Sequence, residues 1–168
     1  MENLKNKIQS DLTEALKSQN VVVRDTLRVL SAAILSKEKE KRYKISKDGK
    51  VSTEEELTKK SVLIDEEVMD VIVSEAKKRK ESILEFEKGK RDDLAKKEKQ
   101  ELEVLQKYLP EQLPEEEVKK LVKEAVENTG AKEIKDMGKV MAALMPKIKG
   151  RADGGMISKI VKDLLSPK

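Results

Sequence analysis

Residues 137–168, MGKVMAALMPKIKGRADGGMISKIVKDLLSPK, decide the fold of the C-terminal part of the chain. Apolar residues recur there at spacings of three and four, which is the spacing of one face of an α-helix. The first run contains Met137, Val140, Met141, Leu144, Met145 and Ile148, and the second contains Met156, Ile157, Ile160, Val161, Leu164 and Leu165. The stretch therefore predicts two amphipathic helices joined by a short basic connection, residues 146–155.

A third amphipathic helix is predicted just before these two. Pro114 suits the first turn of a helix, and the three glutamates that follow it place carboxylates at the positive end of the helix dipole. The inward positions are Val118, Leu121, Val122, Ala125 and Val126, and Thr129-Gly130 ends the helix. Because Pro110 and Pro114 bracket a short connection, we place a domain boundary there and expect residues 111–168 to form a three-helix domain.

Residues 1–110 predict an N-terminal bundle of about four helices. Apolar spacing indicates a hairpin of helices over residues 4–16 and 23–34, then a long helix from Asp65 to Gly89 and another from residue 92 to Pro110.

Between residues 44 and 63 the apolar spacing lapses, and Ser52-Thr53 followed by three glutamates has the pattern of a capping box. We expect this insertion to be mobile or to project as an arm, so that its removal leaves the thermal midpoint nearly unchanged.

The composition favours an all-α protein and excludes several kinds of chemistry. Charged residues make up 42% and aromatic residues 2% of the 168 residues, which is typical of solvated helices. Because the chain has neither Cys nor His, disulfides, thiolate nucleophiles, imidazole bases and the usual zinc ligands are excluded. We predict no catalytic residue, no metal site and no cofactor. No apolar run approaches the ~20 residues that span a bilayer, and the first residues lack a targeting pattern, so we expect a cytoplasmic protein that contacts no membrane.

Positive charge is concentrated where glycines are frequent. Residues 111–136 contain five lysines and eight acidic residues, whereas residues 137–168 contain seven basic and two acidic residues. This stretch combines cations, glycines that let a backbone come close, and the N-terminus of a helix. Together these features favour binding of an anion, and a nucleic-acid phosphate is our first choice. The candidate RNA-binding residues are Gly138, Lys139, Lys147, Lys149, Gly150, Arg151, Gly154, Gly155 and Lys159.

Other interpretations of these charges stay open. Lysines and arginines on helices ordinarily form a solvated face, and Asp153 is placed to cap the last helix and occupy the N–H donors that an anion would use. Arg79 lies on the apolar face of the long helix, where an arginine has a structural role, in which it snorkels or pairs with a carboxylate of the next helix, or a direct functional role. Its neighbours Lys77, Lys78 and Lys80 form a second candidate contact patch.

Four strings of residues form a specific pattern. They are Lys78-Arg79-Lys80-Glu81-Ser82-Ile83, Glu101-Leu102-Glu103-Val104-Leu105-Gln106-Lys107-Tyr108-Leu109-Pro110, Asp136-Met137-Gly138-Lys139-Val140-Met141 and Lys149-Gly150-Arg151-Ala152-Asp153-Gly154. This pattern resembles the YqeY family of small bacterial proteins, over nearly the whole chain apart from the insertion. Family members usually have Ser where this chain has Pro114, so that helix start is capped differently.

The family is similar to the C-terminal tail of the B subunit of the glutamine-dependent amidotransferase that converts misacylated Glu-tRNA(Gln) or Asp-tRNA(Asn) to the amide form. In that enzyme the tail binds the tRNA, while the carbon–nitrogen ligase chemistry, with glutamine as amido-N-donor, takes place elsewhere. The resemblance therefore implies two helical domains and an association with tRNA, and it implies no catalysis by this chain.

Two hypotheses for the function follow. The first is a tRNA-binding module that recognises shape, since one Phe and two Tyr provide little base stacking. The second is a protein-interaction module that docks on an amidotransferase or another translation enzyme, with the sparsely apolar helix from Asp92 to Tyr108 as its surface. A stand-alone enzyme would have to work with carboxylates and lysines alone. The sequence does not indicate an oligomeric state.

Overall fold

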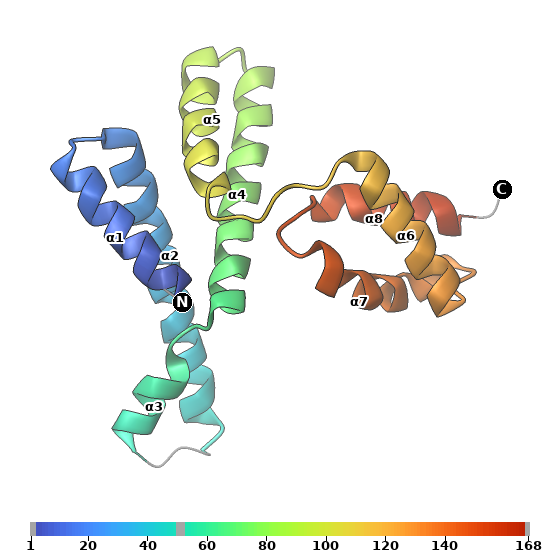
Figure 1. Cartoon of the computed structure of the whole chain (residues 1–168), viewed down its shortest axis with the longest axis horizontal. Coiled ribbons are helices and arrows are strands. Elements are labelled where there is room, and N and C mark those ends of the chain that lie inside the picture. Colours follow the sequence, from blue (N-terminus) through green and yellow to red (C-terminus); the bar gives the residue numbers. More distant parts are fainter. Residues whose placement is uncertain (1–2, 50–52, 167–168) are drawn as a thin grey trace. The chain divides into compact units, whose positions relative to one another are not determined.

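The computed structural model of the chain describes residues 3–49 and 53–166. Within these ranges it contains eight α-helices, one short 3-10 helix and no β-strand, so the predicted all-α class is confirmed. The helices group into two compact units, Met1–Tyr108 and Leu109–Lys168, called unit 1 and unit 2 below (Figure 1).

Unit 1 begins with the predicted helical hairpin. α1 (Leu4–Lys17) and α2 (Val21–Lys47) start after Asn3 and Asn20, whose side chains each accept a hydrogen bond from the backbone N–H three residues later (2.9 and 3.2 Å). These N-caps satisfy donors that the helix itself leaves unpaired. Gln19 adopts a left-handed conformation (φ 56°) in the turn between the two helices.

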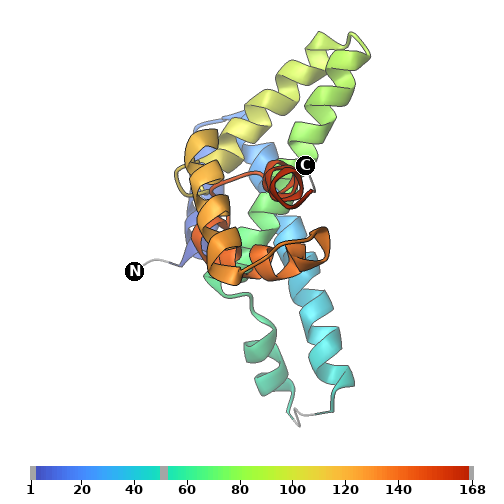
Figure 2. The same cartoon turned by 90° about the vertical axis from the view of Figure 1, so that its right-hand side faces the viewer.

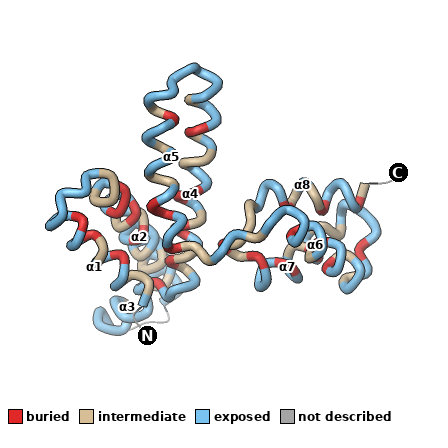
Figure 3. The backbone as a smooth tube through the Cα atoms, turned by 45° about the horizontal axis from the view of Figure 1, so that its top comes forward, coloured by how far each residue is buried: buried red, intermediate tan, exposed pale blue. Residues whose placement is uncertain are grey.

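A second hairpin completes the core of unit 1. α4 (Asp65–Lys88) and α5 (Asp92–Gln106) pack on each other and on α2, and the buried residues lie along the contacts between helices (Figure 3). The largest fully buried side chains of this unit are Ile8, Leu27, Leu30, Leu63, Ile72 and Leu105. Apolar spacing predicts six inward positions for the long helix, of which Val68, Val71, Ile72, Ala76 and Ile83 are buried and Phe86 is half-buried.

The insertion at residues 44–63 contains the short helix that the capping pattern after Ser52-Thr53 predicts. α2 continues to Lys47, and α3 (Glu54–Ser61) folds back along it, so that the two form an arm away from the rest of unit 1 (Figures 1 and 2). Arg42 of α2 holds α3, because its guanidinium donates to the Thr58 hydroxyl (3.0 Å) and to a Glu54 carboxylate.

The predicted limits of this insertion need correction. Thr53 caps α3 by accepting a hydrogen bond from the Glu56 N–H (3.3 Å), whereas Ser52 lies outside the described residues. Leu63, at the predicted C-terminal limit, is only 2% exposed, and its N–H donates to Glu38 Oε1 (3.2 Å). Leu63 therefore belongs to the core of unit 1 rather than to the arm.

Unit 2 consists of three helices around one apolar core. α6 (Glu115–Thr129) ends at Gly130, which has a left-handed φ of 63°, and α7 (Met137–Ile148) follows a single 3-10 turn, Ile134–Asp136. α8 (Gly154–Leu165) packs against both other helices. Their core contains Val118, Val122, Ala125, Ala131, Val140, Leu144, Ile148, Ile157, Val161 and Leu165.

Several residues predicted to face inward are exposed instead. Leu16 of unit 1 is 46% exposed, and Met145, Met156 and Leu164 of unit 2 are 43%, 36% and 42% exposed. In a bundle of three short helices each helix is covered over less than half of its circumference, so residues at the edge of an apolar stripe remain in contact with solvent.

Candidate functional site

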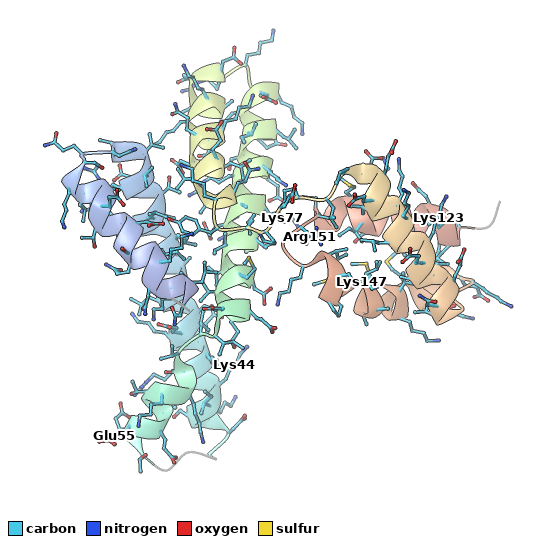
Figure 4. The ribbon with its side chains drawn as sticks, viewed as in Figure 1. Lys44, Glu55, Lys77, Lys123, Lys147 and Arg151 are labelled. Atoms are coloured by element: carbon cyan, nitrogen blue, oxygen red, sulfur yellow. The ribbon has the colours of Figure 1, made fainter. Side chains whose placement is uncertain are left out.

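Six of the nine candidate RNA-binding residues lie on or beside the connection between α7 and α8. Lys147 is in the last turn of α7, and Lys149, Gly150 and Arg151 follow it (Figure 4). Gly154 and Gly155 form the first turn of α8. Lys147 is exposed, whereas Lys149 and Arg151 are half-buried. The predicted basic connection is thus a compact loop at one end of unit 2.

The connection is held by the segment that precedes α6. The Leu113 N–H donates to the Arg151 carbonyl (2.7 Å), and the Gln112 side-chain amide donates to the Gly150 carbonyl (2.7 Å). Arg151 Nε in turn donates to the Glu111 carbonyl (3.3 Å). The sequence indicated residues 111–113 only as a linker, because hydrogen bonds of backbone groups leave no side-chain pattern to detect. These contacts fix the backbone of the loop and hence the positions of its cations.

Gly150 has a structural reason to be glycine. Its φ is +74°, a conformation that costs any residue with a Cβ, and the residue is buried with its carbonyl already bonded to Gln112. The positive φ of Gly150 therefore explains why this residue is a glycine. The close approach of a ligand, which the sequence suggested as the reason, is not needed.

Gly138 and Gly154 differ from Gly150 in this respect. Both have ordinary helical conformations, and a Cβ added to either would meet no atom within 4 Å. Neither backbone strain nor packing within the described residues requires glycine at these positions. Their backbone is exposed, and its role in contact with a ligand stays a prediction.

Asp153 caps α8 as expected. Its Oδ1 accepts hydrogen bonds from the N–H groups of Gly155 (2.8 Å) and Met156 (3.1 Å). Two donors of the helix N-terminus are therefore taken by a carboxylate of the chain, and an anion bound at this end would have to rely on the side chains of the connection.

The structure does not bring the remaining candidates to the connection. Gly138 and Lys139 lie in the first turn of α7, and Lys139 precedes Lys147 by about 12 Å along the helix axis. Lys139 also forms an ion pair with Asp136 (3.2 Å). The backbone N–H of Lys132 is the main reason that the pKa of Asp136 lies below its ordinary value, and Lys139 adds to this effect.

Lys159 lies in the middle of α8, near the start of α6. Its charge contributes to the lowered pKa of Glu115, although the hydrogen bond from Lys119 is the larger cause. Lys159 is exposed and lies on the helix that the connection leads into.

Arg79 is a structural residue. Its Nε lies 2.8 Å from Glu101 Oε2 and 3.5 Å from Glu98 Oε2, both on α5, and its side chain is 14% exposed. Pairing with carboxylates of the next helix was one of the two predicted roles, and the geometry favours it. The neighbouring patch is also partly neutralised, because Lys78 pairs with Glu75 (2.6 Å) and Lys77 lies 3.8 Å from Glu81.

Unit 1 also contains a groove of about 770 Å³ between α2 and α4. Lysines and acids line it in pairs, including Lys41 with Glu67 (2.6 Å) and Lys37 with Glu40 (2.8 Å). Because these charges compensate one another, the groove has no excess positive charge for a phosphate.

The stretch of residues 137–152 differs from both of these features of unit 1. It contains four cations and no carboxylate, in a chain that has 33 acidic residues in 168. Within residues 3–49 and 53–166, neither Lys147 nor Arg151 forms an ion pair with a carboxylate. Lys147 and Arg151 therefore carry positive charge that no carboxylate of the described residues pairs with.

No group of three or more acidic side chains in the described ranges could hold a metal ion. None of the helices, where the chain is described, is long and apolar enough to cross a membrane.

Comparison with known proteins identifies relatives along the whole chain. The altered inheritance of mitochondria protein 41, mitochondrial, of Pyrenophora tritici-repentis is 33% identical, with 96% of this chain and 81% of the relative covered. A protein of the same name from Candida glabrata is 31% identical over 62% of this chain and 48% of the relative. An uncharacterised protein of Schizosaccharomyces pombe is 31% identical over 65% of this chain and 74% of the relative.

These relatives are fungal, whereas the resemblance noted from the sequence was to bacterial proteins. The family model described as Yqey-like protein matches residues 5–165, which is nearly the whole chain, so the protein belongs to the YqeY family.

Proposed function

We propose that the protein is a tRNA-binding module with no catalysis of its own, and that the connection between α7 and α8 is its phosphate-contacting surface. The observation that carries the proposal is that Lys147 and Arg151, in a run of residues 139–151 without a carboxylate, form no ion pair with a carboxylate of the described residues. A polyanion gains most from cations that the protein has not already neutralised, because binding then displaces counterions from the nucleic acid without breaking an ion pair.

The fixed backbone of the connection supports the same proposal. Hydrogen bonds to Gly150 and Arg151 hold the backbone of the loop, so binding does not have to order the backbone that carries Lys149 and Arg151. Gly154 leaves open space beside them for a sugar–phosphate backbone. Lys147, Lys149 and Arg151 supply the charge in this proposal, with Lys159 in the middle of α8 and Gly138 and Lys139 at the far end of α7 as outlying contacts.

The shortage of aromatic residues determines the kind of RNA that the surface suits. The chain has one Phe and two Tyr, and Tyr108 is buried. Stacking of unpaired bases is therefore not the source of affinity. Double-stranded RNA is recognised through phosphates and 2′-hydroxyls, which cations on a helical scaffold can contact without aromatic side chains.

The resemblance to the tRNA-binding tail of the amidotransferase B subunit makes tRNA our choice among structured RNAs. Two relatives carry the word mitochondrial in their names. The proposal requires a compartment that contains tRNA, which the cytoplasm and the mitochondrial matrix both do. The cytoplasm stays the proposed location of this chain.

The proposal is tested with a triple variant of the full-length protein, Lys147→Ala, Lys149→Ala and Arg151→Ala. We expect it to bind tRNA less tightly, by a similar factor for every tRNA species. The slope of log affinity against log salt should fall by about 0.7 to 0.9 for each phosphate that the variant no longer neutralises. The matched control is Lys120→Ala, Lys123→Ala and Lys132→Ala, which removes the same charge from exposed positions of α6 and the turn after it.

Unchanged affinity and salt slope in the first triple variant would refute the assignment of this surface. An equal drop in affinity in both triple variants would show that only the net charge of unit 2 matters. Purification of the protein from cells at low salt adds an independent outcome, since a stoichiometric protein partner without enriched tRNA would favour the docking hypothesis instead.

A further inference from the structure

The solvent-facing side of α2 carries apolar residues that the core of unit 1 does not use. The buried residues of this helix, Thr26, Leu27, Leu30 and Ile34, lie on one side of it. Residues on the other side include four large apolar ones that are 47% to 69% exposed, namely Val21, Val29, Leu35 and Tyr43. α2 thus has 27 residues and two apolar sides, and the core of unit 1 covers only one of them. The other side is available to a partner.

Along this outer side, residues equally far before and after Ala32 form complementary pairs, either two apolar residues or one acidic and one basic residue. Asp25 lies seven residues before Ala32, and Lys39 lies seven residues after it. Val29 and Leu35 lie three residues to either side of the same centre. Val21 and Tyr43, eleven residues away in each direction, end the apolar stretch. Ala32 itself is exposed and small enough to let a second helix come close.

We propose that two copies of this chain associate through this side of α2, antiparallel and related by a two-fold axis at Ala32. In such a pair, a residue before the axis lies opposite the residue equally far after it in the second copy. Apolar residues then meet apolar residues, and Asp25 meets Lys39 at both ends of the contact.

Charge selects this arrangement over a parallel one. Side-by-side parallel helices would place Asp25 against Asp25 and Lys39 against Lys39, and both contacts are repulsive. In the antiparallel pair both contacts become attractive, and Arg28 lies opposite the uncharged Ser36. Asp25 is 51% exposed and bonds to Arg24 within its own chain (2.7 Å), and Lys39 has no ion pair among the described residues. Arg28 and Lys97 are the other cations close enough to lower the pKa of Asp25.

The size of the contact predicts a weak dimer. One pair of helices about 40 Å long buries an area at the low end of the range for specific interfaces, near or below about 1,200 Å² in total. We therefore expect sedimentation equilibrium of the full-length protein to show a monomer–dimer equilibrium between about 1 and 500 µM, and the dimer to weaken as salt is added. A protein that stays monomeric over this whole range overturns the proposal.

Charge reversal tests which surface is used. Asp25→Lys and Lys39→Asp should each raise the dimer dissociation constant by about 10-fold, because each creates two repulsive contacts. The double variant should return to within about 3-fold of the wild type, because reversal of both charges restores attraction. Lys60→Asp, at an exposed position of α3, serves as the control. A dimer that responds equally to all four changes would overturn the assignment to α2.

Cysteine cross-linking tests the register, because the chain contains no Cys of its own. At the axis, Ala32→Cys meets the same residue of the second copy, and oxidised glutathione should join the two chains by a disulfide. Lys39→Cys would lie about 21 Å from its equivalent in the second copy, far beyond the ~7 Å that a disulfide allows between Cα atoms. Equal cross-linking of both variants would overturn the antiparallel register.

Discussion

The hydroxyl of Tyr108 donates a hydrogen bond to Oδ2 of Asp11 over 2.5 Å, joining residues 97 positions apart in the chain. Tyr108 is 8% exposed, and the Lys7 ammonium lies 5.9 Å from the centre of its ring. Burial raises the pKa of Tyr108 above its ordinary value, and the hydrogen bond to Asp11 raises it further. This hydrogen bond connects the C-terminal end of unit 1 to α1.

We expect Tyr108→Phe to lower the free energy of unfolding by about 1 to 3 kcal/mol, because Asp11 then has no hydroxyl to accept from in a half-buried position. Urea unfolding of the full-length protein measures the change. Tyr43→Phe is the matched control, since Tyr43 is 69% exposed and should change stability by less than about 0.5 kcal/mol. Equal effects of the two substitutions would show that the hydrogen bond to Asp11 does not stabilise the fold.

The same tyrosine should make stability depend on pH in alkaline solution. The unfolded chain ionises Tyr108 near pH 10, whereas the folded protein keeps the proton because its pKa is raised. The folded state then binds more protons than the unfolded state, so this contribution to stability falls as the pH rises above about 10. The stability difference between wild type and Tyr108→Phe should narrow between about pH 9 and pH 11.

Arg79 should be the most sensitive charged residue of unit 1. Its guanidinium lies within 4.0 Å of carboxylates from Glu75, Glu98 and Glu101. Arg79→Leu would leave the half-buried Glu98 and Glu101 without their main counterion, whereas Glu75 keeps Lys78, and we expect urea unfolding to show a decrease in stability of about 3 to 5 kcal/mol. Lys88→Leu should cost less than about 1 kcal/mol, because the Lys88–Glu85 pair is more than 70% exposed on both sides.

The sequence predicted best those features that depend on burial. The apolar spacing located all three helices of unit 2, Gly130 marked a helix end, and the position of Arg79 on an apolar face suggested its pairing with α5. The C-terminal half of α2 was missed because residues 36–47 contain few apolar side chains, so that helix propensity and ion pairs rather than burial maintain it. The hydrogen bond from the Gln112 side chain to the Gly150 carbonyl was also missed, since a hydrogen bond to a backbone carbonyl leaves no periodic pattern in the sequence.

The corrected boundary of the α2–α3 arm gives a further prediction. Leu63 is 2% exposed, so Leu63→Ala should lower the free energy of unfolding by about 2 to 4 kcal/mol. Leu57→Ala, in the half-buried face of α3, should cost less than about 1 kcal/mol. Removal of residues 44–63 as a block should therefore lower the thermal midpoint, contrary to the expectation from the sequence, because it takes Leu63 with it. If Leu63→Ala and Leu57→Ala lower the free energy of unfolding by similar amounts, α3 also belongs to the core of unit 1.

Asp153 allows the cap of α8 and the proposed RNA surface to be separated. Asp153→Ala removes the acceptor for Gly155 and Met156 and should cost about 1 kcal/mol in thermal unfolding. Asp153→Asn keeps a capping oxygen, so stability should hardly change, while one negative charge beside Lys149 and Arg151 disappears. If phosphates bind at the connection, Asp153→Asn should bind tRNA about 3-fold more tightly at low salt, and the gain should shrink as salt is added.

Asp163→Asn is the control for this last prediction, because it removes the same charge from an exposed position near the opposite end of α8. A general effect of net charge would raise tRNA affinity equally in Asp153→Asn and Asp163→Asn. A gain confined to Asp153→Asn would locate the bound phosphates at the α7–α8 connection, since screening in water limits the influence of a single charge to about 10 Å at moderate salt. If wild type and Asp153→Asn bind tRNA with the same affinity at every salt concentration, the RNA does not bind near the N-terminus of α8.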